Sequence, residues 1–345
     1  MEFKILLMIV AFITGTIFSH LSKGKKPKVR KILEHITVMY LLFKIGFLGG
    51  GELVCQQWQT ICFQSIVAVV ASSLWTLFVL VLLKRWSSFE RTTQVSIATH
   101  FGSVSVGTFI AAIAFLEAMK IAINPGAVTW LSIMEFPAII IGMWKLGICP
   151  KKLLLIMKEK WTLAILPISL ILGLFFGKSL PETINYVLFG PIFIPILLYF
   201  LFEMGCKSSD NLSNLKKDIL SVVFVGVLVP ILGGIFGSAI GYWMGYSTSG
   251  MFIMAVLMAS ASYVLAPLCI YEILKSIYKN NQKIAKQVVS ISMALSVGVT
   301  LPFNILIGLE LYYVIVKAMQ TSPVLAFLGI ALPVVLTGVN LKYWK

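Results

Sequence analysis

Charged residues are scarce in this sequence. Asp and Glu number 13 and Lys and Arg 28 among 345 residues, so that 12% of the chain is charged. An average soluble domain is about 25% charged, and so few acidic groups cannot solvate a globular surface of this size. Because 59% of the residues are hydrophobic, the composition excludes a soluble fold and predicts an integral membrane protein whose main solvent is lipid.

Cysteine is also scarce, with five residues and no paired spacing of the kind that zinc or an iron–sulfur cluster needs. The sequence lacks Gly-x-Ser-x-Gly, His-Glu-x-x-His, phosphate-binding and dinucleotide-binding motifs. We therefore expect neither an enzyme nor a bound metal or other cofactor. The net charge of +15 arises from short basic tracts between apolar segments, which indicates topology signals and no nucleic-acid partner.

Apolar runs long enough to span about 30 Å predict ten helices and an eleventh candidate. They cover residues 4–20, 33–49, 61–83, 93–119, 127–145, 161–178, 184–206, 219–245, 251–275 and 287–317, with the last from Pro323 to Asn340. Lys and Arg collect in alternate loops, at 23–31, 84–91, 145–160, 207–217 and 275–286. The positive-inside rule places these loops in the cytoplasm and the N-terminus outside. With eleven crossings, the basic C-terminus is cytoplasmic too.

The two halves of the chain share three correspondences in the same order. Residues 42–46 match 201–205, Ser103-Val104-Ser105 matches Ser260-Ala261-Ser262, and Pro137 matches Pro302. A unit of five helices returns to the opposite side of the membrane, so the second copy is inverted, as in many secondary transporters. We predict an all-α polytopic membrane protein in which residues 1–160 and 161–318 form two inverted five-helix repeats, followed by a C-terminal transmembrane helix in 319–345.

Two of the predicted helices are interrupted. The fourth contains Phe101-Gly102-Ser103-Val104-Ser105-Val106-Gly107-Thr108, and the ninth contains Ala259-Ser260-Ala261-Ser262-Tyr263. Glycine, hydroxyl and β-branched residues weaken a continuous helix, although small residues also serve close helix packing. Half-helices that meet at the midplane would present free N–H groups to a small anion. The substrate-binding candidates are Gly102, Ser103, Val104, Ser105, Thr108, Ser260, Ala261, Ser262 and Tyr263.

Ionisable residues inside the membrane cost about 2.5 to 3.5 kcal/mol each on insertion scales and demand a role. Lys44 and Glu203 occupy matched positions of the repeat, which fits either a buried ion pair or part of a cation or proton site. Glu135 precedes Phe136-Pro137, where the proline frees a backbone carbonyl that a coupling cation could use. The coupling-ion candidates are Glu135, Glu203, Thr300, Asn304 and His100.

The motifs together resemble the sodium-dependent bicarbonate permeases of the SbtA type. The similar stretches are Leu41 to Gly50, the first break from Phe101 to Thr108, Met134 to Ala138, and Phe202 to Gly205, and the resemblance spans residues 1 to about 318. It implies a core domain that moves against a gate domain, a homotrimer, and bicarbonate and sodium bound between the broken helices. Where that family has an acidic residue after its second serine cluster, this chain has Tyr263.

The leading hypothesis is a secondary transporter of the bacterial inner membrane that imports a small anion, with bicarbonate as the first choice, together with sodium by alternating access. A second hypothesis keeps the fold and couples another small anion or a carboxylate to protons, through His100 or Glu203. A third is a membrane sensor or scaffold without transport, whose basic loops bind anionic lipid or a regulatory protein. A PII-like protein on the cytoplasmic face is the regulatory partner that we expect.

Overall fold

The computed structural model describes residues 2–22, 27–54, 56–148, 165–179, 181, 183, 190–213, 219–279 and 281–337. Every regular element in these ranges is a helix. Six helices are long and apolar enough to cross a membrane, and three shorter apolar helices accompany them, namely Leu6–Leu21, Thr248–Met258 and Pro323–Pro333. The all-helical fold is thus confirmed for the described residues, whereas the number of crossings stays a prediction.

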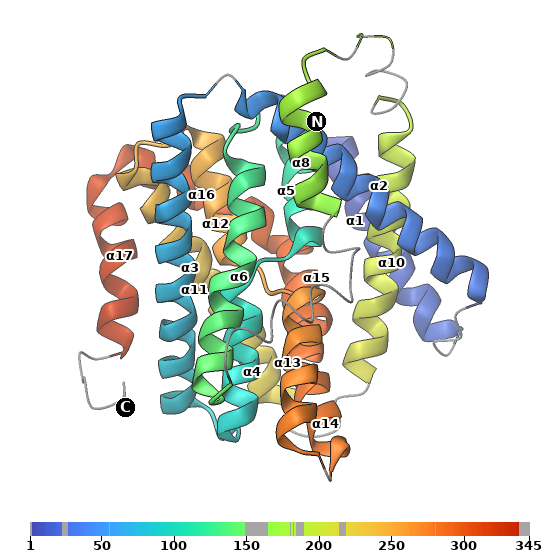
Figure 1. Cartoon of the computed structure of the whole chain (residues 1–345), viewed down its shortest axis with the longest axis vertical. Coiled ribbons are helices and arrows are strands. Elements are labelled where there is room, and N and C mark those ends of the chain that lie inside the picture. Colours follow the sequence, from blue (N-terminus) through green and yellow to red (C-terminus); the bar gives the residue numbers. More distant parts are fainter. Residues whose placement is uncertain are drawn as a thin grey trace.

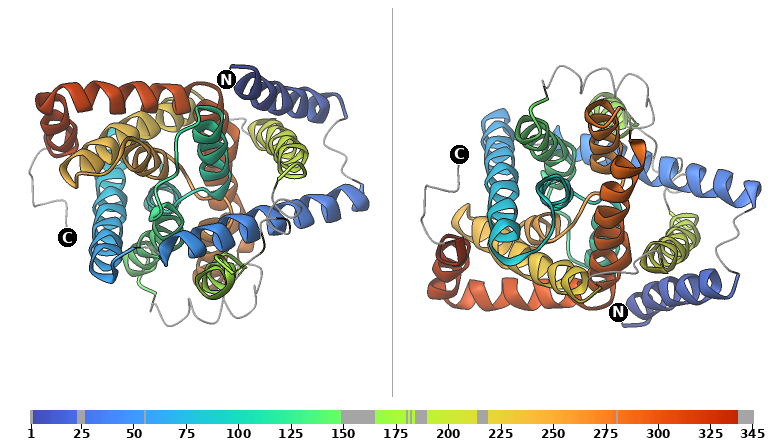
Figure 2. Two further views of the ribbon diagram at one scale, coloured as in Figure 1. Left: turned by 90° about the horizontal axis from the view of Figure 1, so that it is seen from above. Right: turned by 90° about the horizontal axis from the view of Figure 1, so that it is seen from below.

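Four helices lie to one side of the molecule, and we call them the flanking helices: α1 (Glu2–Leu21), α2 (Lys28–Leu53), α8 (Ile165–Phe176) and α10 (Phe193–Ser213). Helix α1 packs along α10, and α2 packs along α8. Figure 2 shows α1 in dark blue, α2 in blue and α10 in yellow-green, all on the side opposite α17. Small residues let helix backbones approach closely in such pairs.

Glycines make both close pairings. A Cβ at Gly15 or Gly205 would collide with the backbone of the opposite helix in the α1–α10 pair, and the same holds for Gly50 and Gly173 in the α2–α8 pair. Gly205 lies against Phe12 and Thr16 of α1, and Gly50 lies against Leu170 and Leu174 of α8. The inverted repeat, with its match of Lys44 to Glu203, remains a prediction.

The other helices form the main bundle. It is built from α3 (Trp58–Trp86), α4 (Arg91–Gly102), α5 (Val106–Ala118), α6 (Ala127–Lys145), α11 (Ile219–Trp243), α12 (Thr248–Met258), α13 (Leu265–Ile277), α14 (Gln282–Met293), η2 (Ala294–Thr300), α15 (Leu301–Phe303), η3 (Asn304–Gly308) and α16 (Leu309–Thr321). Elements α14 to α16 follow one another without a loop, with two π-helical stretches around Pro302. Trp75, Trp130 and Tyr312 are among the largest fully buried side chains of this bundle.

Both predicted helix interruptions are present. Residues 103–105 separate α4 from α5, and residues 259–264 separate α12 from α13. Figure 1 places α5 and α12 toward one end of the bundle and α4 and α13 toward the other, so the two broken helices run in opposite directions. The connections α3–α4 and α13–α14 are both flanked by Lys or Arg and lie at the same end (Figure 1), as expected if both face the cytoplasm.

The helix predicted from Pro323 is also present, as α17 (Pro323–Thr337). It packs on α11, α16 and α3 of the main bundle. The last residues predicted for it, 338–340, lie outside the described part of the chain. Residues 149–160, which are most of the basic tract predicted at 145–160, and residues 214–218 lie outside it too.

Candidate functional site

The first break is held by hydrogen bonds from neighbouring helices. Ser72 of α3 donates to the carbonyl of Gly102 (2.8 Å) and is also near that of Met134 (3.2 Å). Ser103 donates its hydroxyl to the carbonyl of Glu135 on α6 (3.2 Å). A Cβ at Gly102 would overlap the side chain of Thr76, which explains why glycine stands at this helix end.

Ser105 caps the N-terminus of α5. Its Oγ accepts the backbone N–H of Thr108 (3.2 Å) and the Thr108 hydroxyl (3.0 Å), which is the usual role of serine at this position. The N–H groups of Val106 and Gly107 come before the first intrahelical hydrogen bond and have no partner within the helix. The positive end of the α5 dipole therefore opens at the break.

The second break crosses the first and is bonded to it. The Ser105 N–H donates to the Oγ of Ser260 (2.9 Å), and that hydroxyl donates to the carbonyl of Leu257 (2.9 Å). The Ser262 N–H donates to the carbonyl of His100 (2.7 Å). The Oγ of Ser262 lies 3.4 Å from the backbone N–H of Ala266, near the start of α13. Two hydrogen bonds donated by backbone N–H groups thus join the two breaks, which are about 155 residues apart in sequence.

The candidate residues from both breaks are buried together. Ser103, Val104, Ser105 and Thr108 of the first break, and Ser260, Ala261 and Ser262 of the second, are each at most 2% exposed. Water is largely excluded, so partial charges at the two helix N-termini act with little screening. The arrangement can bind a small anion through N–H and O–H donors without a cationic side chain.

Tyr263 lies at the edge of this site. Its hydroxyl is next to the backbone of Gly107 and near the Ser105 side chain, so the phenol occupies the open N-terminus of α5. Its ring faces α10, where the Lys207 ammonium lies 5.9 Å from the ring centroid. Tyr263 therefore joins the break of the main bundle to the flanking helices.

Glu135 and His100 are coupling-ion candidates that lie near the breaks. Glu135 is partly buried, and its carboxylate is close enough to Tyr263 and Cys269 to interact with both electrostatically. His100 is fully buried, and its Nδ1 is paired with the carbonyl of Ser96 at 2.7 Å. Its Nε2 has no hydrogen-bond partner among the described residues.

Thr300 and Asn304 both donate hydrogen bonds to backbone carbonyls of neighbouring segments. Thr300 donates to the carbonyl of Gly226 (2.9 Å), which is the carbonyl that Pro230, four residues later in α11, leaves without its helical donor. Asn304 donates to the carbonyl of Ala259 (3.0 Å) at the second break. Its Oδ1 accepts the Tyr312 hydroxyl (2.7 Å).

Glu203 forms a buried ion pair, as one of the two sequence-based interpretations allowed, but its partner is Arg30 and not Lys44. Its carboxylate is fully buried and lies 2.5 Å from Nε of Arg30 on α2. The Arg30 guanidinium also packs against the rings of Phe18 and Phe202, at 5.1 and 5.2 Å from their centroids. Lys44, the partner suggested by the sequence comparison, instead lies over the ring of Phe193.

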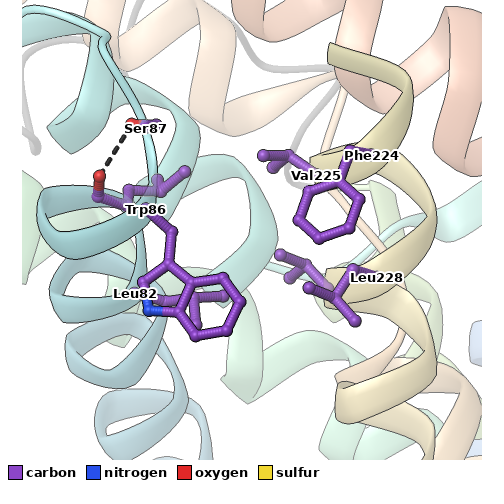
Figure 3. A pocket seen from close by; sticks show the side chains of 8 residues that line it. Leu82, Trp86, Ser87, Phe224, Val225 and Leu228 are labelled. Carbon is purple, nitrogen blue, oxygen red and sulfur yellow. Dashed lines mark hydrogen bonds between the residues drawn. The ribbon is translucent and has the colours of Figure 1, made fainter. Parts of the chain in front are cut away.

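One hollow of the main bundle, away from the breaks, is too small to hold an anion. Figure 3 shows it between α3 and α11, where Leu82 and Trp86 face Phe224 and Leu228. Its volume is about 10 Å³, which is room for about one water molecule. The described residues also contain no group of three or more His, Cys, Asp or Glu side chains placed to hold a metal ion.

The family model of the Na⁺-dependent bicarbonate transporter superfamily matches residues 7–317. The chain belongs to this superfamily. The resemblance predicted from the motifs is thereby confirmed, and with it a multi-pass membrane protein of a transporter family. The superfamily match ends before α17. Among curated proteins no match is found.

Proposed function

We propose that this member of the superfamily imports bicarbonate together with sodium by alternating access, with the anion bound between the two helix breaks. The observation that carries the proposal is the pair of hydrogen bonds from Ser105 to Ser260 and from Ser262 to His100. These bonds hold the N-termini of α5 and α13 close together in the buried interior of the main bundle. Broken helices are costly inside a membrane unless they line a binding cavity.

Sodium is proposed to bind beside the anion, near Glu135. Pro137 stands inside α6, and a proline leaves the carbonyl four residues earlier without its helical donor. Oxygen ligands of this kind suit a hard cation. The Glu135 carboxylate would take the place of the acidic residue that Tyr263 replaces in the second break.

Movement of the main bundle against the flanking helices would expose the site to each side in turn. The two helix groups correspond to the core and gate domains that the family resemblance implies. We further propose an outward N-terminus, a bacterial inner-membrane location and a homotrimer. Binding of a PII-like protein to the basic face remains a prediction.

The test is uptake of ¹⁴C-bicarbonate into proteoliposomes under an inward sodium gradient. Ser105→Ala with Ser262→Ala removes donors and caps at both breaks, and each lost hydrogen bond is worth about 0.5–1.5 kcal/mol, or about 2- to 13-fold in affinity. We expect a higher KM for bicarbonate in this variant. Ser65→Ala, which removes only a bond to the carbonyl of Ile61 in α3, is the matched control.

Uptake that is unchanged when potassium replaces sodium would exclude sodium coupling. An unchanged KM in the double serine variant would exclude the breaks as the anion site. These two outcomes are independent, because the first concerns the gradient and the second concerns the place of binding.

A second candidate, proton-coupled anion transport, is favoured by the environment of His100. Its Nε2 is buried without a partner among the described residues, and imidazole is the side chain best suited to proton exchange near neutral pH. A pH gradient imposed without sodium distinguishes the two mechanisms. Uptake under that condition, lost in His100→Gln, would support proton coupling.

A further inference from the structure

Lys44 is a buried cation in the middle of a transmembrane helix, away from the breaks. Its residue is 7% exposed, and its ammonium lies 3.1 Å from the centroid of the Phe193 ring. Among the described residues, no carboxylate forms an ion pair with Lys44. A buried charge needs a counter-charge, and a ring face supplies only part of one.

The Lys44 side chain lines a cavity between the two groups of helices. The cavity has a volume of about 90 Å³, and its lining includes Lys44, Glu52, Ile113, Glu117, Asn124 and Phe193. By the same measure that gives the hollow between α3 and α11 room for about one water molecule, this cavity has room for several. It admits an anion of about four heavy atoms and excludes nucleotides and long-chain acids.

The charges in the cavity are arranged with the cation inside and the anions at the rim. Glu52 and Glu117 are exposed, whereas Lys44 is buried. Glu52 is eight residues after Lys44 on α2, about 12 Å along the helix axis. Glu117 is close enough to act electrostatically on the Lys44 ammonium but forms no ion pair with it, so an anion that passes the rim would supply a nearer counter-charge.

The cavity is separate from the helix breaks. Glu117 lies at the far end of α5, eleven residues beyond its first residue Val106, which is about 16 Å along the axis. With the topology proposed above, this end faces the outside. The cavity also contacts both moving parts, because Lys44 belongs to the flanking helices and Glu117 to the main bundle.

We propose that the Lys44 cavity is a second anion site, which takes up a small monovalent oxyanion at the outer face before the anion reaches the breaks. The ammonium of Lys44 binds the anion, and the ring of Phe193 holds the ammonium in place. The inference deepens the proposed function and rests on it for the identity of the anion as bicarbonate. The existence of the second site rests on the cavity and its charges alone.

The experiment is equilibrium binding of ¹⁴C-bicarbonate to the purified full-length protein. We expect two anions per chain in the wild type and one in Lys44→Met. Lys44→Arg keeps the charge and should keep two. Lys317→Met is the matched control, because Lys317 is exposed and also lies over an aromatic ring, Tyr313 at 5.6 Å, but outside the cavity.

A wild type and a Lys44→Met variant that bind equal numbers of anions would overturn the second site. Failure of the proposed function gives a different pattern. In that case the double serine variant of the breaks binds as the wild type does, while Lys44→Met still loses one anion.

Glu117→Gln provides a second measurement should Lys44→Met fold poorly. Removing a carboxylate from the rim lowers the repulsion of an entering anion, so affinity at the Lys44 site should rise several-fold. Unchanged or weaker binding in Glu117→Gln would contradict the proposal, since it would mean that no anion passes this carboxylate.

Discussion

Replacing Tyr263 by Phe tests whether the phenol competes with the anion for the N-terminus of α5. The Tyr263 hydroxyl lies next to the backbone of Gly107 and near the Ser105 side chain. Those N–H and O–H groups are the donors that an anion would use. Phe keeps the ring that faces Lys207 and removes only the oxygen.

The magnitude follows from the contact that is lost. A neutral hydrogen bond contributes about 0.5–1.5 kcal/mol net. In the wild type, an anion must break the hydrogen bond between the phenol and Gly107 before it binds. In Tyr263→Phe this free-energy cost is absent, so the affinity for the anion should rise by about 2- to 13-fold. The direction depends on competition, because a phenol that donates to the anion would have the opposite effect.

The assay is the bicarbonate concentration dependence of sodium-driven uptake, together with direct binding in detergent. Tyr313→Phe serves as the control, since Tyr313 packs against Phe115 and Phe252, outside the breaks. A lower affinity in Tyr263→Phe than in the wild type would refute the competition argument and would make the phenol a ligand of the anion.

Three further substitutions test the frame of the site. Glu203→Gln leaves the partly buried Arg30 guanidinium without its carboxylate and should lower the free energy of unfolding by about 3 kcal/mol, read from thermal melting in detergent. Asn304→Ala deprives the carbonyl of Ala259 of its donor, at about 1–3 kcal/mol, and should reduce anion binding with little change in expression. Gly205→Ala places a methyl group against the backbone of α1 and should lower the melting temperature more than Ala substitution of an exposed residue.

The breaks could be predicted because their residues conflict with the helices around them. Glycine and serine in an otherwise apolar span predicted an interruption over 101–108, and the structure confines it to 103–105. The difference arises from Ser105, whose side chain caps α5 and starts the helix early. Ser72, which supports the break from α3, could not be identified, because a lone serine in an apolar helix carries no signal of its partner.

The other long-range partners could not be predicted either, because a single residue carries no signal of which distant residue it contacts. Arg30 stands in a basic tract that topology already explains, 173 residues from Glu203. Thr300 and Asn304 have the polar atoms of ion ligands, but their contacts with the carbonyls of Gly226 and Ala259 depend on how distant helices pack. A polar residue inside a membrane is expected to have a role, but its polarity does not show whether it binds an ion or makes a structural hydrogen bond.

The two ties between the breaks have a kinetic consequence. Separating them would leave a buried N–H or carbonyl unpaired, at about 1–3 kcal/mol each, whereas sliding the main bundle as one body breaks neither the bond from Ser105 to Ser260 nor that from Ser262 to His100. A bound ion would then cross the membrane together with the main bundle and keep all of its ligands. Turnover would be governed by friction between large apolar surfaces, so it should follow the order of the surrounding lipid chains more closely than the chemistry of the cargo.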